Sequence, residues 1–115
     1  MGLKTKNYII EKSGIVLENA YAVVKKLIVD RGKGVAIIGI SNSRDNAINK
    51  EPLDEVKIKF TYDIDVDNIV QKAYETARGK KYVEKYDWEN QQFYYEEEDM
   101  PFHGWENDYY GVTDE

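Results

Sequence analysis

The chain has 115 residues, a formal net charge of -6 and no cysteine. This length predicts one domain with a modest core, and the lack of cysteine excludes a disulfide framework, a thiolate nucleophile and a cysteine metal site. The N-terminal apolar run Ile9-Ile10 is too short for a signal peptide, and no stretch approaches the roughly 18 apolar residues of a membrane helix. We therefore expect a soluble protein that is not secreted by a signal peptide and has no membrane partner.

The charges are unevenly distributed along the chain. Residues 1–82 hold 15 of the 16 basic groups and 11 of the 22 acids, a balance of +4. Residues 83–115 hold one basic group, Lys85, and 11 acids, a balance of -10. Such a split is typical of an interaction tail attached to a folded body.

The stretch from Gly14 to Ser41 predicts the central hairpin of the fold. Two runs rich in Val, Ile and Tyr are joined by Asp30-Arg31-Gly32-Lys33-Gly34, whose two glycines can supply positive φ angles. Both runs are apolar on both faces, except where the adjacent lysines Lys25 and Lys26 indicate a bulge or a solvated margin. A second layer or a partner subunit must therefore cover the hairpin.

Three segments flank this hairpin. We expect residues 1–6 to be a loose lead-in and residues 8–10 to form a short strand against the hairpin edge. Residues 41–54 are polar and contain Pro52, so they predict a surface loop. Residues 56–62 alternate strictly, with Val56, Ile58, Phe60 and Tyr62 on one face, and predict a half-buried strand.

A helix is predicted over Asp65–Arg78. Asp65 can cap its N-terminus, Ile64 can pack on Ile69, and Gly79 can end it. One apolar stripe runs along it, formed by Val66, Ile69, Val70, Ala73, Tyr74 and Ala77. This stripe is the natural cover for the hairpin.

These elements predict an α+β fold. We expect a twisted antiparallel sheet of three to five strands in residues 1–82, with the helix 65–78 packed on one face. Residues 83–115 are predicted to be a partly irregular acidic, aromatic C-terminal arm, in which residues 92–95 can form a last strand.

Three patterns suggest chemistry, and for each the structural interpretation is favoured. Asp63-x-Asp65-x-Asp67 resembles the start of a calcium loop, but it has Asn68 at the glycine position and Tyr74 at the glutamate position. Gly32-x-Gly34 leads into a strand, whereas a phosphate-binding loop leads into a helix. His103, with Asp99, Glu106 and Asp108 nearby in the sequence, is the only histidine. We expect no catalytic residue, metal, cofactor or small-molecule substrate.

A basic surface is the basis for an alternative function. Lys57 and Lys59 share one face of their strand, and four more cations can extend that surface: Lys25, Lys26, Arg31 and Lys33. With stacking aromatics, such a surface binds single-stranded nucleic acid. The balance of +4 is small for that purpose, so a solvated strand face is the favoured interpretation.

The C-terminal segment is the most unusual part of the sequence, because it combines many acids with many aromatic residues. Either it wraps its own domain, or it docks on a neighbouring subunit with aromatic anchors in pockets and acids against lysines. For the second case the predicted partner-binding residues are Trp88, Phe93, Tyr95, Phe102, Trp105, Tyr109 and Tyr110.

Three short motifs occur in order within residues 14–78: Asn19-Ala20-Tyr21, Lys50-Glu51-Pro52 and Ala73-Tyr74. With these motifs the chain resembles small uncharacterised proteins of phages and prophages of Gram-positive bacteria, from the tail or structural gene region. The resemblance implies a structural role in the host cytoplasm or the virion, and it supplies no catalytic residues.

We therefore expect a non-enzymatic, phage-type structural or assembly protein that contacts itself, as a homo-oligomer, or other virion proteins. The alternative is a phage nucleic-acid accessory protein, either a single-strand binding module with an acidic tail or an acidic DNA mimic.

Overall fold

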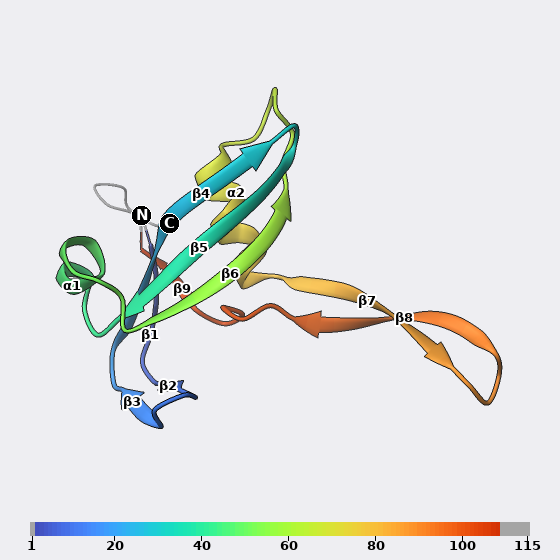
Figure 1. The fold of residues 1–115 in the computed structure, drawn as a ribbon, viewed down its shortest axis with the longest axis horizontal. Coiled ribbons are helices and arrows are strands. Elements are labelled where there is room, and N and C mark those ends of the chain that lie inside the picture. Colours follow the sequence, from blue (N-terminus) through green and yellow to red (C-terminus); the bar gives the residue numbers. More distant parts are fainter. Residues whose placement is uncertain (1, 109–115) are drawn as a thin grey trace.

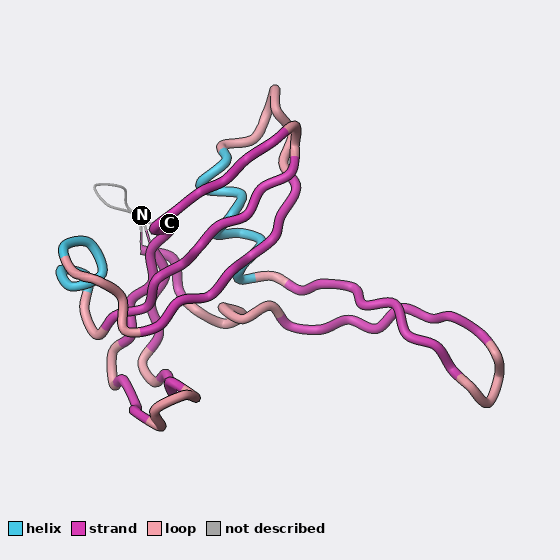
Figure 2. The backbone as a smooth tube through the Cα atoms, viewed as in Figure 1, coloured by secondary structure: helices cyan, strands magenta, loops and turns pink. Residues whose placement is uncertain are grey.

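The computed structural model describes residues 2–108 and has an antiparallel β-sheet as its main layer. The sheet has five strands in the order β6-β5-β4-β1-β9. The α+β class predicted from the sequence is confirmed, with two short helices beside the strands. Figure 1 shows helix α2 behind the sheet and a long two-stranded arm, β7–β8, that projects away from it, and Figure 2 shows how much of the chain is strand.

The hairpin of β4 (Ala20–Asp30) and β5 (Lys33–Ser41) forms the middle of the sheet. Its register shifts between Val24 and Lys26, which is the bulge that the two adjacent lysines indicated. The positive φ angles of the turn belong to Arg31 (48°) and Gly32 (85°), so the expectation that Gly34 supplies one is wrong. Gly34 lies in β5 and leaves room for the ring of Phe60.

Strand β6 (Asp54–Thr61) pairs with β5 and forms one edge of the sheet. Ile58 and Phe60 are buried on the face that α2 (Ile69–Arg78) covers. The helix starts later than predicted, because Asn68 is the N-cap and its side chain accepts a hydrogen bond from the Gln71 N–H at 3.1 Å.

Residues 63–67 form a turn instead of the first turn of the helix. The Asp67 carboxylate accepts a hydrogen bond from the Asp63 N–H (2.8 Å), and the Asp63 carboxylate accepts one from the Asp65 N–H (2.9 Å). Ile64 and Val66 are exposed, so the predicted packing of Ile64 on Ile69 and the place of Val66 in the buried stripe are wrong. Val70, another predicted member of the stripe, is also exposed. Short acidic side chains that bond to nearby backbone amides favour such turns over helix.

The N-terminal residues are part of the sheet, which corrects the expected loose lead-in. Strand β1 (Gly2–Thr5) pairs with β4 on one side and with β9 (Glu106–Asp108) on the other, and Leu3 is fully buried. Strand β2 (Tyr8–Ile10) pairs with β3 (Ile15–Leu17), the first residues of the predicted hairpin stretch. These residues form a strand separate from β4, so β2 and β3 make a small hairpin of their own and β2 does not pair with the central hairpin of β4 and β5. The polar segment after β5 contains helix α1 (Arg44–Asn49), capped by Ser43, where only a loop was expected.

The segment between the arm and β9 completes the core. Phe102 and Trp105 are buried among the apolar residues of the sheet and α2, and their rings contact each other edge to face with centroids 4.8 Å apart. Trp105 also meets Tyr8 of β2 at 5.6 Å. Residues 80–108 are therefore divided between an exposed arm and a segment that contributes to the core.

Candidate functional site

The arm is a hairpin of β7 (Lys80–Asp87) and β8 (Gln92–Asp99), which replaces the expected irregular segment. Figure 1 shows it extending away from the sheet and α2. No side chain from residue 80 to residue 99 is buried. The radius of gyration is 16.1 Å, against about 13 Å for a compact domain of this length. The arm thus lies outside the core and faces solvent on both sides.

Aromatic side chains gather on one face of this arm. Residues directly paired across an antiparallel ribbon have their side chains on the same face. The pairs Tyr82–Glu97, Glu84–Tyr95 and Tyr86–Phe93 therefore share a face. Tyr82, Phe93 and Tyr95 are each about 70% exposed (73%, 68% and 71%). We call Tyr82, Tyr86, Phe93 and Tyr95 the aromatic face.

Trp88 extends this face into the turn at the tip. It is 83% exposed, and its ring meets Tyr86 edge to face at 4.6 Å, while Tyr86 meets Phe93 at 4.8 Å. The turn is held by Asp87, whose carboxylate accepts hydrogen bonds from the side chain of Asn90 (2.8 Å) and from the Glu89 N–H (3.0 Å). The bonds from Asn90 and Glu89 lower the pKa of Asp87. The rings at the tip are thus presented by a locally ordered turn.

The opposite face of the arm carries cross-strand ion pairs. Lys85 reaches Glu96 at 2.5 Å and Glu98 at 3.5 Å. The hydrogen bond to Glu96, more than any other contact, raises the pKa of Lys85. Because these groups are solvated, each pair contributes little to stability. They join the two strands on a face where acids outnumber lysines.

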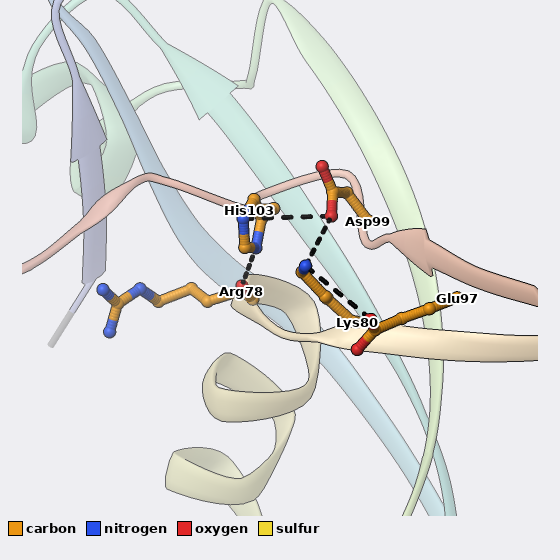
Figure 3. Close-up of polar contacts among 5 residues, drawn as sticks. All are labelled: Arg78, Lys80, Glu97, Asp99 and His103. Atoms are coloured by element: carbon orange, nitrogen blue, oxygen red, sulfur yellow. Dashed lines mark hydrogen bonds and ion pairs between the residues drawn. The ribbon is translucent and has the colours of Figure 1, made fainter.

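The base of the arm is tied to the end of α2. The Met100 N–H donates to the Gly79 carbonyl (3.0 Å), and the Phe102 N–H donates to the Ala77 carbonyl (3.0 Å). Figure 3 shows His103 between the Arg78 carbonyl (3.1 Å from Nδ1) and Asp99 (3.8 Å from Nε2), with Lys80 close to Asp99. Lys80 lies 3.9 Å from both Asp99 and Glu97. These contacts set the direction in which the arm leaves the body.

The structure separates the predicted partner-binding residues into three groups. Trp88, Phe93 and Tyr95 lie exposed on the arm. Phe102 and Trp105 are only 1% and 6% exposed, so their prediction as partner contacts is wrong. They are buried because the hydrogen bond from the Phe102 N–H to the Ala77 carbonyl draws their segment against α2. Tyr109 and Tyr110 lie outside the described residues.

Sequence reasoning missed Tyr82 and Tyr86 as parts of this site. The signal for them was present, since Tyr82, Glu84 and Tyr86 alternate with Val83 and Lys85 as expected in a strand. Their partner strand also contains Tyr94, which lies on the ion-paired face and is 44% exposed.

The other candidate sites do not assemble. His103 contacts Asp99 at the base of the arm, whereas Glu106 and Asp108 lie in β9 at the edge of the sheet. Within residues 2–108, no three His, Asp or Glu side chains are grouped closely enough to hold a metal ion. Lys25 turns toward α1 and donates to the Ala47 carbonyl, so it is not part of the expected basic surface.

Among residues 2–108, no helix has the length and apolar character needed to cross a membrane.

The arm is a projecting ribbon with exposed rings on one face and an excess of acids around them. Comparison of the chain with known protein families, with characterised proteins and with solved structures found no match.

Proposed function

We propose that the protein acts through protein–protein contacts made by the β7–β8 arm, as a non-enzymatic structural or assembly protein of the phage type. The observation that carries this proposal is the aromatic face, a set of large rings on an element with no buried side chain. Tyrosine and tryptophan are enriched among the few residues that carry most of the binding energy of protein interfaces.

The form of the arm supports the same proposal. An isolated two-stranded ribbon is marginally stable in water, so a partner that covers one face would also stabilise the arm itself. Residues 83–99 hold seven acids and one lysine, a net charge of -6. This charge keeps the exposed rings soluble before the partner is met and favours a basic partner surface.

The setting of this activity belongs to the proposal as well. Partners are other copies of the chain or other virion proteins, in the host cytoplasm or in the virion. The resemblance over residues 14–78 supports the phage setting, and the arm, which lies outside that region, supplies the contact.

A nucleic-acid accessory role is the second candidate, and one observation favours it. Lys26, Lys57 and Lys59 are exposed on the sheet face that α2 leaves open. Among the described residues, however, the exposed rings lie on the acidic arm, which repels phosphate, and only Tyr82 at the base of the arm lies near one of these lysines, Lys59. A DNA mimic would use the acids of the arm but would leave its aromatic face unexplained.

Site-specific photo-crosslinking tests the proposal. A photo-reactive residue is placed at position 88 on the arm tip or, as a control, at position 66, since Trp88 and Val66 are similarly exposed (83% and 79%). Each protein is irradiated in cells that express it together with its neighbouring genes, and the products are identified by mass spectrometry.

We expect position 88 to give a discrete protein adduct, either with this chain or with one other protein, and position 66 to give none. Crosslinks from position 88 only to nucleic acid, or the same diffuse products from both positions, would contradict the proposal.

A further inference from the structure

A basic groove lies beside the base of the arm. It has a volume of about 950 Å³ and lies between the end of the β4–β5 hairpin, strand β6, helix α2 and the start of β7. Its lining includes Ile28, Lys33, Lys59, Phe60, Lys72 and Lys81. Four lysines and one acid, Asp30, line it together with apolar side chains such as Ile28 and Phe60. The groove follows the β6 edge of the sheet, so it takes Lys59 from the face that α2 leaves open and Phe60 from the face that α2 covers.

The arm has the complementary chemistry. Strand β8 contains four acids and no cation, and the aromatic face carries Glu84 and Glu97 between its rings. Rings flanked by carboxylates match apolar side chains flanked by lysines. Strands β6 and β8 each have eight residues, so both extend over about 26 Å. β6 also forms an edge of the five-stranded sheet.

Beyond Lys81 and Tyr82 at its base, the arm does not reach the groove of its own chain. Figure 1 shows that the arm leaves its base in the direction away from the sheet and α2, whose residues line the groove. An occupant with this chemistry must therefore come from another molecule. Since each chain carries both an arm and a groove, two copies can satisfy each other across a two-fold axis.

We propose that the partner of the arm is a second copy of this chain, and that each arm docks in the lysine-lined groove of the other copy in a reciprocal dimer. This inference rests on the proposed function and names its partner. Lys81 and Tyr82 lie at the base of the arm and also line the groove. In the dimer, the two arm–groove contacts are therefore next to each other.

Charge reversal on each side provides the test. The groove variant carries Lys59→Glu and Lys72→Glu. The arm variant carries Glu84→Lys and Glu89→Lys, two acids that form no ion pair among the described residues. A control variant carries Lys12→Glu and Lys50→Glu, which have the same charge change but do not line the groove. Circular dichroism verifies that each protein is folded.

Sedimentation velocity then measures the mass of each protein over a range of concentrations. For the unmodified chain we expect the mass to rise from 13.4 kDa toward twice that value, with weaker association at high salt. The groove and arm variants are expected to remain monomeric when each is alone, and the control is expected to dimerise.

The mixture of the two variants is decisive. In a mixed pair, the reversed arm meets the reversed groove and the unmodified arm meets the unmodified groove, so both contacts are attractive again. An equimolar mixture should therefore recover the dimer. Folded variants that dimerise unchanged, or whose mixture stays monomeric, would overturn the inference.

Two further outcomes separate this inference from the proposed function. A monomeric unmodified chain, together with a discrete adduct from position 88 to a different protein, would overturn the dimer and leave the proposed function standing. The groove variant can also be tested for binding to a labelled single-stranded oligonucleotide. If it loses this binding but shows the same sedimentation mass as the unmodified chain, the groove binds nucleic acid and the dimer inference is wrong.

Discussion

The Tyr74 hydroxyl of α2 accepts a hydrogen bond from the Val24 N–H of β4 at 2.8 Å. Val24 is the last residue before the register shift in β4, so this N–H lies where the regular ladder is interrupted. A bulge leaves backbone groups of the strand without their usual partners. The helix therefore both covers the sheet and satisfies the backbone at its irregular point.

The first prediction concerns this bond. Tyr74→Phe keeps the ring and removes the acceptor for the Val24 N–H, so it should lower the free energy of unfolding by about 1–3 kcal/mol. Urea unfolding followed by circular dichroism measures the change. Tyr82→Phe on the exposed arm is the matched control and should change stability by less than about 0.5 kcal/mol. Equal effects of the two substitutions would show that the bond contributes nothing.

The second prediction contrasts a buried and an exposed aromatic residue. Phe102→Ala should cost about 3–5 kcal/mol, because the side chain is 1% exposed and its removal leaves a cavity beside Trp105. Trp88→Ala should cost less than about 1 kcal/mol, since that ring is 83% exposed. Thermal unfolding of both variants provides the measurement. A comparable loss in both would contradict the burial of the segment that contains Phe102.

The third prediction concerns the close packing of Gly34 and Phe60. A methyl group at position 34 would overlap the Phe60 ring, which is itself buried. Gly34→Ala should therefore lower the free energy of unfolding by about 1–3 kcal/mol. Phe60→Leu shortens the opposing side chain. In the double variant, the loss of unfolding free energy should therefore be smaller than the sum of the losses in the two single variants. Additive losses in the double variant would refute this interpretation.

The fourth prediction is a pH dependence of the arm tip. The pKa of folded Asp87 lies below its ordinary value of 3.8, so its contribution to the turn is complete above that value. The contribution is lost as the pH falls through the lowered pKa. The amide signal of Glu89, recorded by NMR during acid titration, should have a midpoint below 3.8. In Asp87→Asn the component of this titration that comes from Asp87 should disappear, and a midpoint above 3.8 for that component in the unmodified chain would contradict the prediction.

Some strands could be predicted from the local sequence because their alternation of apolar and polar residues is complete within a few residues. Strand β6 alternates without a break, and its inward residues Ile58 and Phe60 are buried. Strand β1 has no such pattern, and Gly2–Thr5 becomes a strand because it pairs with β4 and β9, which are distant in sequence. Pairing partners of that kind are supplied by the fold and not by local preference.

The candidate site shows the same division. The acidic, aromatic character of residues 83–115 is a property of the sequence itself, as is the α+β class. Which rings face solvent was decided by tertiary structure, since Trp88 and Trp105 have the same side chain and opposite environments. The hydrogen bonds from Met100 and Phe102 to the end of α2 close the arm at its base and place the following residues in the core. Composition sets how much aromatic surface the chain contains, whereas long-range backbone contacts decide where that surface is exposed.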